Sequence, residues 1–232
     1  MSDGLAPGTR HSTCAGVTPL LVRALTPQDS DEFAALVSQH EPEFRKTGLA
    51  TLPSRPAAVP AWLARRADDK NKEALRIVYG IWTGTADRSR LSGFVGIEVV
   101  SRFSGAGIWY GLAPEHRGRG TAKTAALIAM ANFHEQAEIA GAAVPSSWIA
   151  HIRRANTAST HLCAALGFER DPFIDYARQN STRGTTTFLG YRLACDIERV
   201  RSEASARLLA TSLERLVAPH STRRSRRSLQ PA

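Results

Sequence analysis

The chain has 232 residues and a mass of 25.1 kDa, with 43% hydrophobic and 22% charged residues. This composition is close to that of an average globular domain and excludes a collagen, a coiled-coil rod and a fully disordered chain. The longest apolar run, at 125–131, is about seven residues, whereas a membrane-spanning helix needs roughly twenty. We therefore expect no membrane contact. The first thirty residues lack a secretory signal and Cys14, Cys163 and Cys195 form no metal-binding pair, so a cytoplasmic protein without disulfides or a metal site is expected.

The charge is distinctly basic, because 30 Lys and Arg residues oppose 21 Asp and Glu residues. The formal net charge is +9 and the sequence pI is about 10.2. Four arginines lie within the last ten residues, and without them the body carries a charge of about +5. A modestly basic body suits a phosphorylated ligand or an acidic partner. The arginine-rich tail is interpreted as a solvated end, and no nucleic-acid partner is expected.

The N-terminal half predicts a helix pair followed by strands. Residues 1–18 form a flexible lead-in, and a short strand covers 20–25. Thr26, Pro27 and Asp29 then have the order of a helix start, with a cap, a first-turn proline and an acidic residue at the positive end. A second short helix is expected at 61–68. Runs rich in Val, Ile, Tyr and Trp then predict three antiparallel strands, at 75–83, 91–100 and 107–112.

The C-terminal half alternates helices and strands. A polar, glycine-rich turn at 114–120 leads into an Ala-rich helix, and Gly167 is placed to end a later one. We expect 170–185 to be a long polar segment without regular structure. An extra helix at 197–218 either packs on the sheet or forms a homodimer contact, and 219–232 is a basic disordered tail. The remaining elements are predicted as helices at 121–137 and 156–166 and strands at 147–152 and 186–193.

The turn before the Ala-rich helix has the chemistry of a diphosphate site. N–H groups at a helix start are unpaired and partly positive, and Gly118 and Gly120 let a phosphate approach the backbone. Arg117 and Arg119 add positive charge. The P-loop pattern fails because no Lys follows at its spacing, and the dinucleotide pattern fails because Lys123 stands where its third glycine belongs. The simpler alternative is a helix-capping loop with solvated arginines.

The order of motifs resembles the GCN5-related N-acetyltransferase (GNAT) superfamily. The run Arg117-Gly118-Arg119-Gly120-Thr121-Ala122 is similar to its [RQ]xxGx[GA] motif, which binds the pyrophosphate of acetyl-CoA. Asn156 and Ser159, followed by Leu166-Gly167-Phe168, are similar to the N-x-x-S…L-G-F signature of the RimJ/RimL-like branch. The resemblance implies an α/β fold at 19–196, with a mixed, mostly antiparallel central sheet and helices on both faces. It also implies acetyl-CoA as acyl donor, held by 117–122 and Asn156.

The same resemblance assigns roles near the thioester. Transfer to an amine requires a held oxyanion and a hydrogen-bond donor to the departing thiolate. Backbone N–H groups at Leu112 and Ala113 are expected to hold the oxyanion, and Gly111 to mark a bulge or a close backbone approach. Ser159 is the first choice for the thiolate donor. Cys163 is the second, because it stands where many members of the superfamily have a tyrosine.

The general base and the acceptor stay open at this point. Glu98 is a carboxylate in an otherwise apolar strand, and His151 is an alternative because imidazole titrates near neutral pH; a water-mediated base is a third. The resemblance implies acetylation of a peptide or protein N-terminal α-amine. A small-molecule amine, such as an antibiotic, is the alternative acceptor. A non-catalytic, CoA-binding regulatory protein is the remaining hypothesis.

Overall fold

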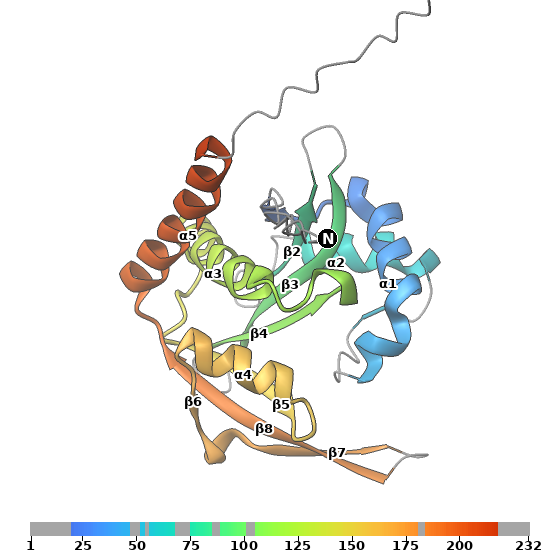
Figure 1. The fold of residues 1–232 in the computed structure, drawn as a ribbon. Coiled ribbons are helices and arrows are strands. Elements are labelled where there is room, and N and C mark those ends of the chain that lie inside the picture. The colour runs from blue at the N-terminus through green and yellow to red at the C-terminus, as the bar shows by residue number, and fades with distance from the viewer. Residues whose placement is uncertain are drawn as a thin grey trace, which may run out of the picture.

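The computed structural model describes residues 20–46, 52–53, 56–67, 75–84, 89–100, 105–180 and 184–217. Its centre is one eight-stranded sheet in the order β1-β2-β3-β4-β5-β8-β6, with β7 paired to the outer part of β8 (Figure 1). Among the strand pairs in the described part of the chain, only β4 and β5 run parallel. The expected mixed, mostly antiparallel sheet is therefore confirmed. The lead-in at 1–18 and the tail at 219–232 lie outside the described residues.

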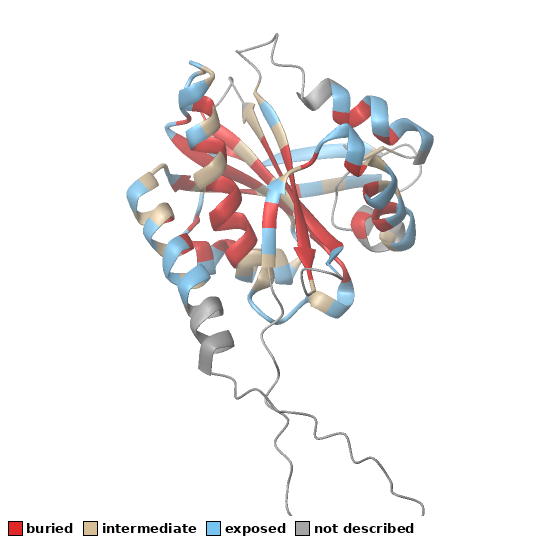
Figure 2. Cartoon of the chain, turned by 90° about the horizontal axis from the view of Figure 1, so that it is seen from above, coloured by how far each residue is buried: buried red, intermediate tan, exposed pale blue. Residues whose placement is uncertain are grey.

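The strands other than β6 and β7 lie where the runs rich in β-branched and aromatic residues predict them, because those runs supply the buried core. In β3, Phe94 packs on one face while Val95 and Ile97 pack on the other. Figure 2 shows this burial concentrated on the central strands. The strands are β1 Leu20–Ala24, β2 Arg76–Thr83, β3 Arg90–Val100, β4 Gly105–Leu112, β5 Ser147–Arg153, β6 Glu169–Arg170, β7 Tyr176–Asn180 and β8 Gly184–Ala194.

The helices divide between the two faces of the sheet, as expected. One hydrophobic cluster joins the sheet to α1 (Ser30–Lys46) and α2 (Val59–Ala67). The other joins it to α3 (Thr121–Ile139), α4 (Thr157–Leu166) and the beginning of α5 (Ile197–Val217), so α5 packs on α3 rather than standing apart from the domain. Within the described part of the chain, no helix is both long and apolar enough to cross a membrane.

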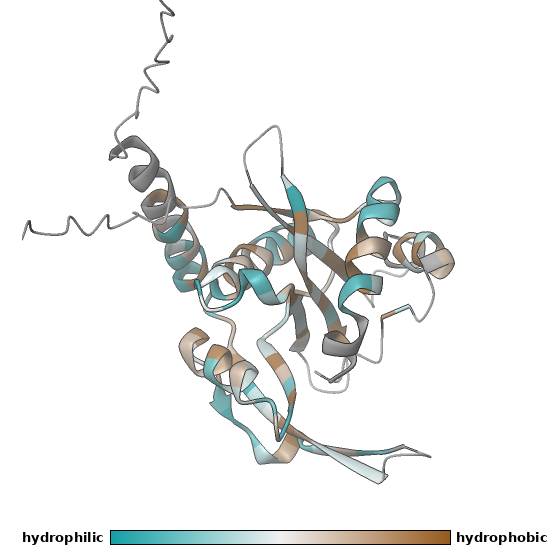
Figure 3. Ribbon diagram, turned by 45° about the vertical axis from the view of Figure 1, so that its right-hand side comes forward, coloured by the Kyte–Doolittle hydropathy of each residue, from teal (hydrophilic) through white to brown (hydrophobic). Residues whose placement is uncertain are grey.

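The polar segment at 170–185 is a correction to the sequence-based expectation. It contains β6, a short 3-10 helix at Pro172–Ile174, and β7, which forms a hairpin with β8. Residues 176–179 are all exposed, and the hairpin carries little hydrophobic colour toward its tip (Figure 3). Because the described side chains of β7 are exposed, this strand has no apolar alternation, which is why the pattern failed to predict it.

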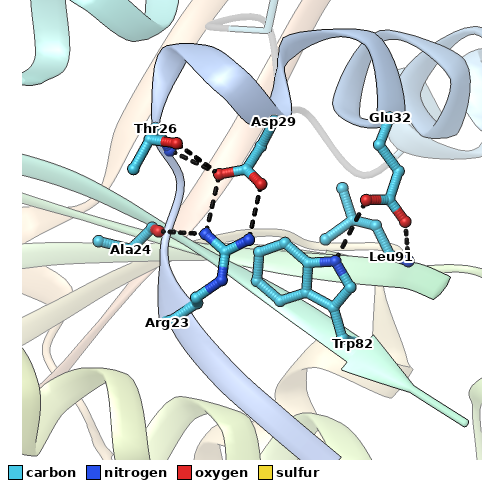
Figure 4. A network of polar contacts seen from close by, with 7 residues as sticks. All are labelled: Arg23, Ala24, Thr26, Asp29, Glu32, Trp82 and Leu91. Atoms are coloured by element: carbon cyan, nitrogen blue, oxygen red, sulfur yellow. Dashed lines mark hydrogen bonds and ion pairs between the residues drawn. The ribbon is translucent and has the colours of Figure 1, made fainter. Parts of the chain in front are cut away.

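A polar network ties the first helix to the sheet (Figure 4). The Asp29 carboxylate accepts hydrogen bonds from the Arg23 guanidinium at 2.7 and 2.9 Å and from the Thr26 N–H at 2.8 Å. One turn later, Glu32 accepts from the Trp82 indole N–H at 3.2 Å and from the Leu91 N–H at 2.6 Å. The helix start that the sequence predicts at 26–29 is thus also the point where α1 is fastened to β1, β2 and β3.

We predict that Asp29→Asn lowers the free energy of unfolding at neutral pH. The Arg23 guanidinium lowers the pKa of Asp29 to about 2, whereas an unfolded Asp titrates near 4. A depressed folded-state pKa stabilises the protein above pH 4, and this contribution is lost as pH falls from about 4 to about 2. Urea unfolding should therefore show a difference between wild type and variant that shrinks over this window. Asp31→Asn, at an exposed position, is the control, and an Asp29 difference independent of pH would contradict the prediction.

Candidate active site

The parallel strands β4 and β5 form a fork. They pair over only two positions, Ala106 with Trp148 and Gly107 with Ile149, and beyond these they separate. A small pocket occupies the opening, and the first turn of α4 closes it on one side. The residues that line it are Ile108, Trp109, Tyr110, Ala150, His151, Ile152, Asn156 and Ser159.

The hydrogen-bond ladder between β3 and β4 decides which backbone groups of β4 face the fork. The Ala113 N–H donates to the Ser92 carbonyl at 2.8 Å, so it points toward β3. Directions alternate along an antiparallel ladder, and the N–H groups of Leu112 and Tyr110 therefore point to the open side. The Ala113 N–H is thus unavailable to the oxyanion. Of the two expected backbone donors, the Leu112 N–H remains, and the Tyr110 N–H is a second donor at the open edge of the strand.

The glycine-rich loop is an exposed turn directly after β4. Gly118 and Gly120 adopt φ of +74° and +75°, a left-handed region that disfavours residues with a side chain. Gly120 is the N-cap of α3, so the unpaired N–H groups of Thr121 and Ala122 open the helix beside it. Exposed Arg119 lies on the same turn. This is the geometry of an anion cradle at the positive end of a long helix.

Arg117 has a structural contact within this turn. Its guanidinium Nε donates to the Leu112 carbonyl at 2.9 Å. The first residue of the RGRGTA run therefore joins the loop to the last residue of β4. The contact couples the position of the cradle to that of the fork, while the role of Arg117 toward a cofactor stays a prediction.

A glycine at position 111 is explained by the packing of aromatic rings, and not by the expected bulge. The register of β4 with β3 shows no bulge at this position. A Cβ on Gly111 would lie 2.5 Å from the Phe94 ring and 3.0 Å from the Phe44 ring. The missing side chain makes room for aromatic rings on the α1–α2 face of the sheet.

The helix cap of α4 explains the Asn156–Ser159 spacing. The Asn156 side-chain carbonyl accepts from the Ser159 N–H at 3.2 Å, which is the geometry of an N-cap residue and the third residue of a helix. Both residues line the fork pocket. Gly167 ends the same helix with φ of +87°, as the sequence predicts. The structure thus brings Asn156 and Ser159 together beside β4 and β5.

Tyr110 is the pocket residue that sequence reasoning missed. Its hydroxyl donates to the Ser159 backbone carbonyl at 3.4 Å and also contacts the Cys163 thiol. Burial raises the pKa of Cys163 to about 12, so the thiol stays neutral, and burial raises the pKa of Tyr110 as well. The alternation of side chains along the strand could have predicted the burial of Tyr110, because it puts Tyr110 on the same face as the buried Ala106 and Ile108.

The structure places the two candidate bases, His151 and Glu98, at different ends of the fork. His151 lies on β5 within the fork, and its Nε2 is 2.9 Å from the Ile174 carbonyl oxygen. A carbonyl only accepts hydrogen bonds, so Nε2 carries the proton and Nδ1 is the basic nitrogen of the neutral ring. Glu98 instead lies opposite Gly107, at the closed end of the fork, 3.7 Å from the Arg76 guanidinium. The structure does not bring Glu98 together with Ser159.

Comparison with solved structures supports the fold. The ribosomal-protein-S5-alanine acetyltransferase from Vibrio fischeri is 16% identical with a TM-score of 0.60, covering 76% of this chain and 93% of that one. The spermidine N-acetyltransferase from Vibrio cholerae, solved with CoA and spermine, is 16% identical with a TM-score of 0.58, covering 75% and 95%. The apo RimL ribosomal L7/L12 α-N-protein acetyltransferase is 15% identical with a TM-score of 0.59, covering 82% and 99%.

The family follows from the sequence itself. No curated protein matches the chain significantly. The family model for the acetyltransferase (GNAT) domain, however, matches residues 19–169, which include β4, the glycine-rich turn, α3 and α4. Together with the fork and the cradle at the start of α3, this match identifies the chain as a member of the GNAT acetyltransferase family, which uses acetyl-CoA as acyl donor.

Proposed function

We propose that this N-acetyltransferase acetylates the α-amine at the N-terminus of a peptide or protein, by direct attack within a ternary complex. The observation that carries the proposal is the fork: it places strand-edge N–H groups, the Asn156–Ser159 cap and an imidazole around one pocket. The similarity of Asn156, Ser159 and the Leu166-Gly167-Phe168 run to the RimJ/RimL-like signature supports the acceptor class.

Acetyl-CoA in this proposal lies along β4. Its pyrophosphate rests on 117–122 at the positive end of α3, and its pantetheine arm enters the fork beside the open edge of β4. The Leu112 and Tyr110 N–H groups face that arm, and a strand-edge N–H stabilises the negative charge on the acetyl oxygen as the tetrahedral intermediate forms. Asn156 contributes at the rim of the same pocket.

The remaining steps involve α4 and β5. The Nδ1 of His151 takes a proton from the acceptor ammonium, directly or through water, and Glu98 is the less favoured base because it lies at the closed end. The neutral amine then forms a bond to the acetyl carbon, and its nitrogen loses a second proton to water. The carbon–sulfur bond breaks, and the departing thiolate takes up a proton from water. Ser159 donates a hydrogen bond to the departing thiolate. Cys163 is a poorer donor because it is 1% exposed and lies behind the Tyr110 hydroxyl.

A small-molecule amine is the second candidate acceptor. Trp109 lines the fork and also belongs to an aromatic cluster on the α1–α2 face, where its ring centroid lies 6.2 Å from that of Trp62 and 5.7 Å from that of Phe94. Aromatic faces attract ammonium groups. The spermidine N-acetyltransferase among the similar structures shows that this fold accommodates a polyamine.

Thiol release from acetyl-CoA tests the acceptor class. We expect turnover with peptides that have a free α-amine and none with the same peptides blocked by Nα-acetylation. Turnover only with spermine or an amino-antibiotic would favour the second candidate. CoA binding without thiol release with any acceptor would favour the regulatory hypothesis.

The same assay tests the general base. His151→Gln should lose turnover while Glu98→Gln retains it, and the reverse result would make Glu98 the base.

We predict that Gly120→Val abolishes stabilisation by acetyl-CoA. A β-branched residue strongly disfavours the left-handed φ at the N-cap of α3, so the loop must move away from the cradle geometry. Asn tolerates this conformation, and Gly120→Asn is the matched control. Cofactor at 100 times its Kd should add about 2.7 kcal/mol to the wild type, which a thermal melt detects. Equal shifts in the wild type and the Val variant would contradict the placement of the diphosphate.

We predict that Ser159→Ala lowers kcat and leaves the affinity for CoA nearly unchanged. Losing one donor to a developing charge costs about 2.7–4 kcal/mol in the barrier, or roughly a hundred- to thousandfold in rate. The Asn156 cap is retained, because Asn156 accepts from the backbone N–H of residue 159. Cys163→Ala should be milder. A silent Ser159 variant beside a strongly impaired Cys163 variant would assign the donor role to the thiol instead.

A further inference from the structure

The helix α5 belongs to the same body as the acetyltransferase fold, although it lies beyond residues 19–169, which the family model matches. Val200 and Ala204 are buried, with 1% and 6% of their surface exposed, in the hydrophobic cluster that contains α3. Figure 1 shows α5 packed on the outer side of α3. The position of α5 relative to the start of α3 is therefore fixed by core packing.

Two successive turns of α5 face the start of α3. Glu203 lies 3.9 Å from the Lys123 ammonium, in the first turn of α3. Arg207 follows one turn later, and its Nη1 lies 4.0 Å from the position that a Cβ would have on Gly120. The guanidinium thus stands beside the N-cap residue whose backbone opens the anion cradle.

The charges of this region favour a multiply charged anion. The cradle already contains the positive end of α3 together with Arg117 and Arg119 on the preceding turn. Arg207 adds a permanent positive charge from a different element, one turn after Glu203, whose carboxylate pairs with Lys123. A guanidinium matches the geometry of phosphate oxygens better than other side chains do.

We propose that Arg207 binds the pyrophosphate of acetyl-CoA and that α5 thereby completes the cofactor site. This inference rests on the proposed position of the diphosphate at 117–122. It assigns a binding function to a helix outside the part of the chain that the family model matches. It also explains why a mostly polar C-terminal helix is held against α3 by Val200 and Ala204: the packing places Arg207 beside Gly120.

Calorimetric titration of the full chain tests the proposal with three ligands: CoA, dephospho-CoA, which lacks only the 3′-phosphate, and pantetheine, which lacks all phosphates. Arg207→Gln should weaken binding of CoA and of dephospho-CoA alike, by roughly tenfold or more for one lost charge-assisted contact, and leave pantetheine binding unchanged. Arg201→Gln is the matched control, because Arg201 lies on the same helix but pairs with Glu138 at 3.6 Å, at the far end of α3.

Three results would overturn the proposal. One is unchanged affinity of Arg207→Gln for CoA. Another is a loss confined to CoA, which would place the guanidinium at the 3′-phosphate. The last is an equal loss in Arg201→Gln, which would indicate a general effect of surface charge. Because the titration needs no acceptor, its failure leaves the proposed acetylation of N-terminal amines standing, and failure of the acceptor assay leaves the role of Arg207 standing.

Discussion

The short pairing between β4 and β5 is the constraint on which the rest of the site depends. Parallel strands joined over only two positions must leave peptide groups of both strands without a ladder partner, and such groups need a partner when water is excluded. A ligand with its own amide groups, such as the pantetheine arm of CoA, can supply that hydrogen-bond partner. The antiparallel ladder to β3 fixes which β4 groups are available, and Arg117 joins the end of that strand to the cradle.

The two faces of the sheet carry different parts of the site. Toward α3 and α4, the strands support the glycine-rich turn at the start of α3 and the capped helix start that holds Ser159 in the fork. Toward α1 and α2, they support aromatic rings that pack edge to face, for which Gly111 and Gly96 leave room. Trp109 lies on the aromatic face and also lines the fork. Acetyl-CoA and the amine acceptor are therefore expected to enter the fork from opposite faces of the sheet.

The sequence predicts the elements that bury apolar side chains and the glycines that require a left-handed φ, because both leave a local pattern. It predicts the strands of the central sheet, the Gly118–Gly120 turn and the end of a helix at Gly167. It fails where the cause is long-range. The described side chains of β7 are exposed, Gly111 leaves room for the rings of Phe94 and Phe44 from other elements, and the Ala113 N–H donates to the Ser92 carbonyl. Arg207 comes to lie beside Gly120 only through the packing of α5 on α3.

The most direct test of this account is a crystal structure of the protein with CoA. The account predicts the pyrophosphate on the N–H groups of residues 120–122, with the pantetheine arm bonded to the open edge of β4 and the sulfur within hydrogen-bonding reach of the Ser159 hydroxyl. A pantetheine arm outside the fork, or a diphosphate away from the start of α3, would contradict it.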